Sequence, residues 1–259
     1  MGKVAVITGA TSGIGLAAAR LFISKGYSVY GIARRPYTGG DFTCYSADIC
    51  DLTAVESILK EIYEREGTID VFVNNAGMGI AGAMEESSPE AVKKIIDVNL
   101  TSTCLLSGTA ARYMKKSGGR IINVSSVGGI MPLPYQATYS ATKAGVEVFS
   151  RALANEVRPY KIKVTCVLPG DTRTGFTEAR VTEGENAAAK RSVAKMERDE
   201  RRGKEPEFVA KVIYKAAVRK RPPLRVCVGF ISKLEVFLSR FLSAKCLNAI
   251  LYKMYGGKG

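Results

Sequence analysis

The stretch Thr8-Gly9-Ala10-Thr11-Ser12-Gly13-Ile14-Gly15 decides the fold. It lies between a short β-branched apolar run, residues 4–8, and a stretch with apolar residues at helical spacing, residues 13–25. Glycines allow a tight turn and bring backbone N–H groups close to a phosphate, and the N-terminus of the following helix favours an anion. A glycine-rich turn in this position predicts a dinucleotide site formed by Gly9, Ser12, Gly13, Ile14 and Gly15.

Strand-like and helix-like patterns alternate along the rest of the chain. Helical spacing predicts helices that include 52–66 and 206–219, and short apolar runs predict strands at 28–33, 42–46, 69–73, 120–124, 163–168 and 224–229. Repeated strand-helix-strand units indicate an α/β fold of the Rossmann type, a doubly wound parallel sheet of about seven strands with helices on both faces. We expect one domain over residues 1–259, because no repeat, low-complexity stretch or linker interrupts the pattern.

The chain of 259 residues contains no histidine. This excludes a Ser-His-Asp triad, a Cys-His pair and any histidine-ligated metal site. Proton transfer must therefore use Tyr, Lys, Asp, Glu or Cys with a shifted pKa, or water. The six cysteines form no Cys-x-x-Cys pair and stand among apolar residues, which indicates reduced, buried thiols in a cytoplasmic protein and no metal site.

The second predicted strand ends at Ala33-Arg34-Arg35, about 20 residues after the glycines. An NAD-binding fold places an acidic residue there for the ribose 2′-hydroxyl, and that acid is missing here. A guanidinium at this point can pair with a 2′-phosphate, whereas a carboxylate would repel it. Arg34 therefore predicts that NADP(H) is preferred over NAD(H).

Three motifs in register with the predicted strands resemble those of the short-chain dehydrogenase/reductase family. They are the glycine-rich turn, Asn74-Asn75-Ala76-Gly77, and Tyr139-Ser-Ala-Thr-Lys143, and the resemblance covers residues 3–175. Ser126 precedes Tyr139 by thirteen residues, the family's spacing, which favours it over Ser125. The resemblance implies an NADP-dependent oxidoreductase, similar to members with a C-terminal extension such as hydroxysteroid and retinol dehydrogenases.

The family's site residues carry over onto matching positions of this chain. The resemblance implies that Ser126 binds the substrate oxygen and that Asn99 holds a water that relays protons from Lys143. It also places Asp48 at the adenine, Asn75 beside the adenosine and ribose, and Lys143 on the nicotinamide ribose. The loop that closes over the nicotinamide is expected to contribute Pro169, Gly170, Thr172 and Thr174.

Tyr139 and Lys143 are four residues apart on a predicted helix, so they share one face. A free phenol has a pKa near 10, and a nearby ammonium favours the phenolate and lowers that value. Tyr139 can then donate a proton to a carbonyl oxygen as hydride arrives, or accept one in the reverse direction. A tyrosine thus takes the place of the missing histidine, and both side chains are also expected to contact the cofactor.

The pattern changes after residue 172. Residues 172–207 are polar and charged, and they are interpreted either as a mobile lid over the substrate or as an ordinary exposed helix. Residues 230–256 form an amphipathic extension with Ile231, Leu234, Leu238 and Phe241 at three- and four-residue steps among basic residues. Such a stripe packs on its own fold or a partner subunit, or contacts a membrane surface or a hydrophobic substrate.

The net charge of +14 is concentrated at the C-terminal end. Residues 1–175 hold 19 basic and 15 acidic residues, and residues 176–259 hold 19 and 9. This bias fits either an anionic surface or ligand, or a solvated helix face. Nucleic acid is not expected, because aromatic residues do not alternate with the basic cluster. The expected partners are further copies in a homodimer or homotetramer and, through the basic C-terminal helix, the periphery of a membrane.

These features predict hydride transfer between NADP(H) and a ketone or secondary alcohol, with a hydrophobic steroid-, bile acid- or lipid-like substrate. An enzymatic alternative is reduction of a 3-oxoacyl thioester, in which the basic region docks an acidic carrier protein. The non-enzymatic alternatives, an NADPH-sensing regulator and a basic binding protein, disagree with the intact Ser126, Tyr139 and Lys143. No apolar run reaches the ~20 residues that span a membrane, so we expect a cytoplasmic protein or one peripheral to a membrane.

Overall fold

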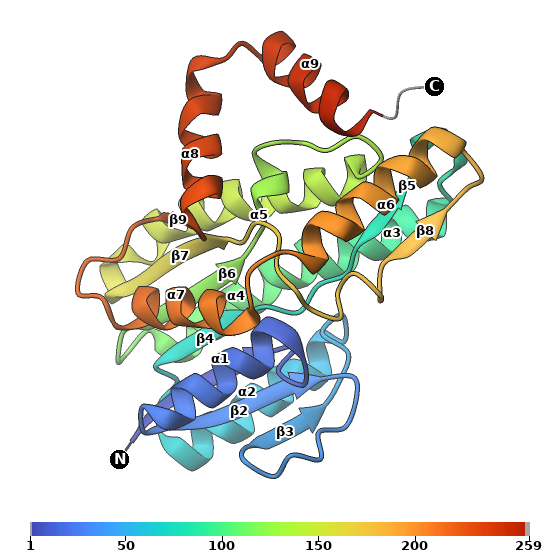
Figure 1. The fold of residues 1–259 in the computed structure, drawn as a ribbon. Helices are drawn as coiled ribbons and strands as arrows, with labels where there is room; N and C mark the ends of the chain where they lie inside the picture. The colour runs from blue at the N-terminus through green and yellow to red at the C-terminus, as the bar shows by residue number, and fades with distance from the viewer. Residues whose placement is uncertain (1, 257–259) are drawn as a thin grey trace.

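The computed structural model describes residues 2–256; residue 1 and residues 257–259 of the expected domain lie outside the described residues. Seven parallel strands form one sheet in the order β3-β2-β1-β4-β6-β7-β9, with helices on both faces (Figure 1). The expected doubly wound, Rossmann-type sheet is therefore confirmed. Its strands are β1 (Lys3–Thr8), β2 (Tyr27–Ala33), β3 (Thr43–Ser46), β4 (Val71–Asn74), β6 (Gly119–Val124), β7 (Ile162–Leu168) and β9 (Arg225–Cys227).

Alternating side chains of β1 fill both faces of the sheet, because successive residues of a strand point to opposite sides. Val4 and Val6 belong to a core cluster with three helices, and Ala5 and Ile7 to a second cluster with two others. The result is three layers, with the sheet between two layers of helices. The first cluster includes α2 (Leu52–Glu66), α4 (Ser102–Met114) and α5 (Ala137–Glu156), and the second α1 (Gly13–Ser24) and α7 (Pro206–Val218).

The strand order places a ligand crevice beside β1 and β4. The chain adds β2 and β3 on one side of β1 and then returns to add β4 on the other side. In a sheet of this type, ligands bind at the carboxyl ends of the strands next to this reversal. Thr8, Asn74 and Val124 end β1, β4 and β6, so the loops that follow them meet at one edge.

The segment expected to be a lid or an exposed helix contains a short strand and a well-packed helix. β8 (Val181–Glu183) pairs in parallel with β5 (Ile80–Gly82), outside the main sheet. It is followed by α6 (Ala187–Arg201), which buries Val193 and Met196. The segment thus contains a partly buried helix, and its expected role as a lid stays a prediction. The connecting elements elsewhere are η1 (Met84–Glu86), α3 (Pro89–Ile96), η2 (Asp97–Thr101), η3 (Val127–Gly129) and η4 (Arg158–Tyr160).

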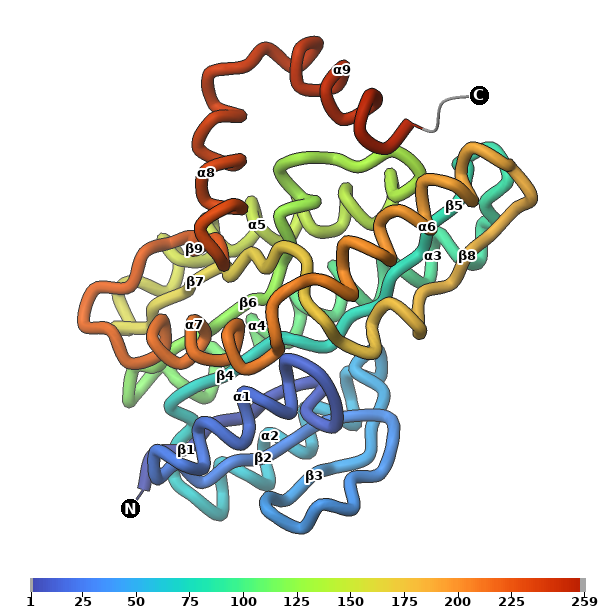
Figure 2. Tube along the Cα trace, viewed as in Figure 1, coloured from blue at the N-terminus to red at the C-terminus, as the bar shows by residue number. Residues whose placement is uncertain are grey.

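The C-terminal extension is two helices, where the sequence predicted one amphipathic stretch. α8 (Phe230–Leu238), the short η5 (Ser239–Phe241) and α9 (Ala244–Tyr255) form an arch that stands out from the three layers (Figures 1 and 2). The bend has a local cause. Leu242 is extended, and the Ser243 hydroxyl accepts a hydrogen bond from the Cys246 N–H at 3.2 Å, so a new helix begins there.

The cysteines are less buried than their apolar neighbours predicted. Cys166 is buried in β7, whereas Cys50 and Cys246 are exposed. The reason is that short apolar runs do not show which face of a helix or loop meets solvent, so the expectation of six buried thiols was wrong. Within residues 2–256, none of the helices is both long and apolar enough to span a membrane.

Candidate active site

A cavity of about 890 Å³ opens at the carboxyl edge of the sheet. It runs from the glycine-rich turn past the end of β6 to the inner side of the C-terminal arch. Two of the sequence-predicted site residues, Gly15 and Asn99, do not line the cavity. Asn99 is buried, with 1% of its surface exposed. The others line the cavity: Gly9, Ser12, Gly13, Ile14, Arg34, Asp48, Asn75, Ser126, Tyr139, Lys143, Pro169, Gly170, Thr172 and Thr174.

The glycine-rich turn has space for a phosphate and none for side chains. Gly9 has a φ of +67°, which favours glycine, and a Cβ there would lie 3.0 Å from the Ala76 Cα. A Cβ on Gly15 would lie 2.2 Å from the Gly9 carbonyl oxygen, so α1 packs directly under the turn. Since no side chain fills the turn and the helix N-terminus faces it, the residues present fit a dinucleotide pyrophosphate.

Thr8 holds the two phosphate-side loops together, a role that the sequence did not reveal. Its hydroxyl oxygen accepts hydrogen bonds from the backbone N–H groups of Asn75 and Ala76, each at 3.0 Å. The Asn75 amide in turn donates to the Thr8 carbonyl at 3.0 Å. Asn75 thus positions the loop after β4 against the glycine-rich turn. A buried threonine that ends a strand is an ordinary pattern, so no sequence signal distinguishes this one.

Arg34 and Asp48 lie at the adenosine end of the cavity. Arg34 directly follows β2 and is exposed, and the Asp48 carboxylate accepts a hydrogen bond from the Cys50 N–H at 2.9 Å. Within residues 2–256, neither Arg34 nor Arg35 forms a salt bridge or donates a side-chain hydrogen bond. Both guanidinium groups line the cavity, and they fit an anionic group on the cofactor ribose.

Ser126, Tyr139 and Lys143 come together at the end of β6 and the start of α5. The Ser126 hydroxyl oxygen accepts the Gly128 N–H at 3.1 Å, so its own hydrogen is free to point toward a substrate. A Cβ placed on Gly128 would lie 3.5 Å from the Ser126 Oγ and 3.7 Å from the Tyr139 ring. Both polar groups therefore border one small space. Lys143 lies one helical turn away, its Nζ 5.8 Å from the centre of the Tyr139 ring.

Ser125 positions the helix that carries this group. Its hydroxyl donates to the Lys143 carbonyl at 2.6 Å, and the Lys143 ammonium donates to the Val124 carbonyl at 3.1 Å. These two bonds fix α5 against the end of β6. Of the adjacent serines, Ser126 therefore faces the cavity space beside Tyr139, and Ser125 is a positioning residue.

The pKa of Tyr139 is shifted in the direction opposite to the one that the sequence predicted. Burial raises the pKa of the Tyr139 phenol, and the neighbouring Ser126 hydroxyl opposes that rise. Burial lowers the pKa of Lys143 to about 8. The expected lowering of the Tyr139 pKa by Lys143 is thus wrong, because burial raises that pKa and the charged neighbours that act on the phenol are Glu200 and Arg180. The phenol is accordingly a proton donor at neutral pH.

Asn99 lies in the π-helical turn η2, where its side chain holds the loop after β4. Its amide oxygen accepts the Met78 N–H, and its amide nitrogen donates to the Met78 carbonyl, both at 2.8 Å. The same nitrogen donates to the Thr142 hydroxyl on α5 at 3.3 Å. These contacts make Asn99 a positioning residue between the loop and α5. Its expected role in holding a relay water stays a prediction.

Charged side chains form part of the cavity wall near Ser126 and Tyr139, and the sequence did not show which residues of the polar segment 172–207 would lie there. Arg180, whose side chain is 2% exposed, pairs with Glu200 of α6, and Glu200 also accepts a hydrogen bond from Thr177 at 2.7 Å. Desolvation and the nearby Glu200 raise the pKa of Asp171 to about 6. Arg180, Glu200, Asp171 and Glu235 all line the cavity. They come from separate segments, so no spacing in the sequence could bring them together.

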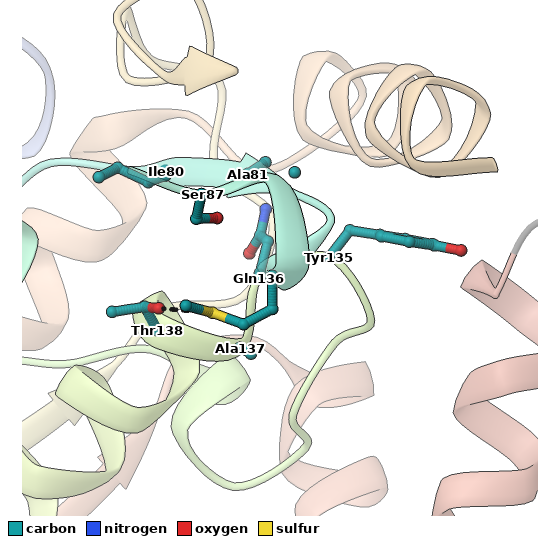
Figure 3. Close-up of a pocket in the computed structure, with 9 residues that line it drawn as sticks. Ile80, Ala81, Ser87, Tyr135, Gln136, Ala137 and Thr138 are labelled. Atoms are coloured by element: carbon teal, nitrogen blue, oxygen red, sulfur yellow. Dashed lines mark hydrogen bonds between the residues drawn. The ribbon is translucent and has the colours of Figure 1, made fainter. Parts of the chain in front are cut away.

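The arch is tied to the rest of the molecule at its far end. The Tyr255 hydroxyl of α9 donates to Asp199 of α6 at 3.2 Å, and Lys195 donates to the Met254 carbonyl at 2.7 Å. The Tyr135 hydroxyl donates to the Gly256 carbonyl at 3.2 Å. Figure 3 shows the Tyr135 side chain pointing away from the smaller cavity beside it. That cavity measures about 40 Å³, enough for about one water, and carries no site.

A family model described as short chain dehydrogenase matches residues 3–185. The chain therefore belongs to the short-chain dehydrogenase/reductase family. It is an oxidoreductase that acts on carbonyl or alcohol groups with a nicotinamide cofactor.

Two groups of relatives are similar to this chain over most of its length. The chain is 39% identical over 236 residues to a 3-ketodihydrosphingosine reductase of Bacteroides thetaiotaomicron, with 88% of each chain covered. It is 37% identical over 187 residues to the 3-oxoacyl-[acyl-carrier-protein] reductase FabG of Escherichia coli, with 69% of this chain and 77% of that one covered.

Solved structures agree with the fold. A short-chain dehydrogenase from Streptomyces avermitilis superposes with a TM-score of 0.83 at 30% identity, covering 98% of this chain and 96% of that one. A 3-ketoacyl-(acyl-carrier-protein) reductase from Brucella melitensis, solved with NADH, gives 0.75 at 27% identity, covering 88% and 96%.

Proposed function

We propose that this protein reduces the ketone of a long-chain lipid with NADPH. The observation that carries this proposal is the shape of the cavity. From Ser126 and Tyr139 it continues to the inner face of the arch, where α9 and the end of α8 contribute mainly apolar side chains to its wall. Burying an apolar chain there contributes about 0.8 kcal/mol for each CH₂ group. The apolar part of this wall comprises Leu238, Leu242, Leu247, Ile250, Leu251 and Met254.

The cofactor and the protein contribute different parts of the reaction. When bound, the nicotinamide cofactor would supply the hydride that the carbonyl carbon accepts. Ser126 donates a hydrogen bond to the carbonyl oxygen and shares the negative charge that develops there. Tyr139 gives its phenolic proton to that oxygen, which yields the alcohol and leaves a phenolate. The Lys143 ammonium stabilises the phenolate until a proton from solvent restores the phenol.

The relatives support a lipid ketone over other substrates of the family. The Bacteroides reductase is named for 3-ketodihydrosphingosine, and its match covers 88% of this chain. The carrier-protein reductases match 69% to 70% of it. The similarity to the lipid enzyme thus extends over more of the chain. Steroids and bile acids, the other hydrophobic substrates that the sequence suggested, have no such support.

The substrate proposal is tested by comparing ketones that differ only in their attached group. Purified protein is assayed for NADPH oxidation with 3-ketodihydrosphingosine, a 3-oxoacyl thioester of matched chain length and a keto-steroid. We expect the highest kcat/KM for the free long-chain ketone. Activity confined to the thioester would favour the carrier-protein alternative, and activity confined to the steroid would also contradict the proposal.

The preference for NADPH rests on Arg34. Its exposed guanidinium lines the adenosine end of the cavity, where it can pair with a 2′-phosphate. We predict that Arg34→Ala raises KM for NADPH about tenfold or more and leaves KM for NADH nearly unchanged, since a charge-assisted hydrogen bond contributes ~1.5–3 kcal/mol. Steady-state kinetics with both cofactors measure the ratio. An unchanged NADPH/NADH ratio would show that Arg34 does not set the preference.

The reduction of a 3-oxoacyl thioester is the second candidate. Several FabG reductases match at 37% to 39% identity, and the C-terminal third is basic enough to attract an acidic carrier protein. Two expectations remain predictions: assembly into a homodimer or homotetramer, and a cytoplasmic location. Light scattering of the purified protein tests the oligomeric state.

A further inference from the structure

The helix α8 presents two different faces. Ser232, Glu235 and Ser239 follow each other at three- and four-residue steps and line the cavity. On the opposite side, Phe230 and Phe237 point away from the cavity. We call this outer face the apolar stripe; it consists of Phe230, Ile231, Leu234, Phe237 and Phe241.

Three side chains of the apolar stripe are the most exposed large apolar side chains among residues 2–256. Phe230 is 80% exposed, Ile231 70% and Phe241 73%. The rings of Phe237 and Phe241 pack against each other at 5.2 Å, so the stripe is continuous across the end of α8. Single exposed apolar residues are ordinary, but a contiguous group of this kind marks an interaction surface.

Positive charge borders the apolar stripe. Lys233 and Arg240 are exposed beside it on the same arch, and Lys245 is exposed at the start of α9. Glu235 is the one acidic residue among residues 230–256, and it faces the cavity. The outer side of the arch is therefore apolar and cationic, with no carboxylate to repel an anion.

We propose that the apolar stripe docks on an anionic lipid bilayer surface. Aromatic and aliphatic side chains flanked by lysine and arginine suit the boundary between headgroups and acyl chains. The opposite face of the same helix lines the cavity, so docking places α8 between the bilayer and the substrate site. The proposal concerns binding alone, and it stands whether or not the protein reduces a lipid ketone.

A second copy of this chain fits the stripe less well. It would bring the same lysines and arginines against each other, and the whole chain already carries a net charge of +14. Like charges across an interface oppose association, whereas anionic headgroups neutralise them. Charge complementarity therefore selects the bilayer as the occupant.

A tryptophan reporter tests the docking directly. The chain contains no tryptophan, so Phe230→Trp adds the single indole of the protein. Fluorescence is recorded with phosphatidylcholine vesicles and with vesicles of phosphatidylcholine and phosphatidylglycerol in equal parts. We expect a blue shift on the anionic vesicles, and none for the control Phe208→Trp on α7, whose exposed ring lies outside the arch.

Charge reversal supplies the second measurement. Lys233→Glu with Arg240→Glu is expected to weaken sedimentation with anionic vesicles about tenfold or more, at about 1 kcal/mol for each charge removed. The matched control is Lys25→Glu with Lys116→Glu, two exposed lysines at the C-terminal ends of α1 and α4, where helix ends lie opposite the cavity edge. Circular dichroism confirms that each variant is folded.

Three results would overturn the proposal. Wild-type protein that does not sediment with anionic vesicles would contradict it, as would equal binding by the arch variant and the control. A blue shift of Phe230→Trp without vesicles, rising with protein concentration, would show that a second copy covers the stripe instead.

Discussion

In the proposed reaction, Tyr139 donates the proton and Lys143 stabilises the phenolate, in a chain without histidine. Their spacing was predicted from the sequence, and the structure places both beside Ser126. The direction of the Tyr139 pKa was not predicted, because desolvation depends on side chains that the surrounding segments contribute. The same limit explains why Thr8 and Ser125 were missed. Each acts through hydrogen bonds to residues distant in the sequence.

Lys143 predicts how activity depends on pH. Because burial lowers its pKa to about 8, the ammonium is present below that pH and is lost above it. The Tyr139 phenol has a raised pKa and keeps its proton over the same range. We expect kcat/KM for ketone reduction to fall as pH rises through about 8, which a pH profile of the free enzyme measures. A profile that stays flat through that pKa would contradict this assignment.

At the scale of elements, the helices were predictable because their burial is periodic, and the strands because they are short, continuously buried apolar runs. The runs at 4–8 and 28–33 differ from β1 and β2 by one residue at the start, and the helix expected at 52–66 has the bounds of α2. The short pair β5 and β8 was not predicted. Each has three residues, too few to show a period, and their pairing joins segments about one hundred residues apart.

The packing of α6 against the cavity wall gives a prediction about stability. Arg180 is 2% exposed and depends on Glu200 for its charge, so Glu200→Gln leaves a buried guanidinium without its counter-charge. We expect the free energy of unfolding to fall by ~3–5 kcal/mol. Urea unfolding measures this change.

The control for that experiment is an ion pair of the same kind on the surface. Arg112 and Glu56 pair at 57% and 50% side-chain exposure. Glu56→Gln is expected to cost less than ~1 kcal/mol, because solvent screens an exposed pair. An equal fall in the free energy of unfolding for Glu200→Gln and Glu56→Gln would show that the pair of Arg180 and Glu200 does not stabilise the cavity wall.

At the scale of the whole molecule, the arch of α8 and α9 (Figure 1) lines one end of the cavity. The sequence predicted an amphipathic extension, but not that one face would line the cavity while the other meets solvent. The bend at Ser243, with its capping hydrogen bond, and the hydrogen bonds between α9 and α6 set this arrangement. The cavity therefore combines a dinucleotide site common to the family with an apolar end that the extension provides.

The apolar end predicts a dependence on chain length. Ile250 of α9 lines the cavity, so Ile250→Ser is expected to lower kcat/KM for a long-chain ketone roughly fivefold or more and to leave a short-chain ketone unaffected. The control is Tyr252→Ser, whose ring lies outside the cavity and is 68% exposed. Measuring kcat/KM of both variants with a long-chain and a short-chain ketone distinguishes an acyl-chain contact from a general loss of activity. Equal losses for both ketones would argue against an acyl chain at the arch.

Ketone-dependent oxidation of NADPH by Tyr139→Phe is the most direct test of the proposed reaction. Phenylalanine preserves the ring beside Phe176 and removes only the phenolic hydroxyl group. We predict that turnover of the long-chain ketone falls about 100-fold or more, while NADPH binding measured by calorimetry changes little. Near-normal turnover by this variant would contradict the assignment of Tyr139 as the proton donor.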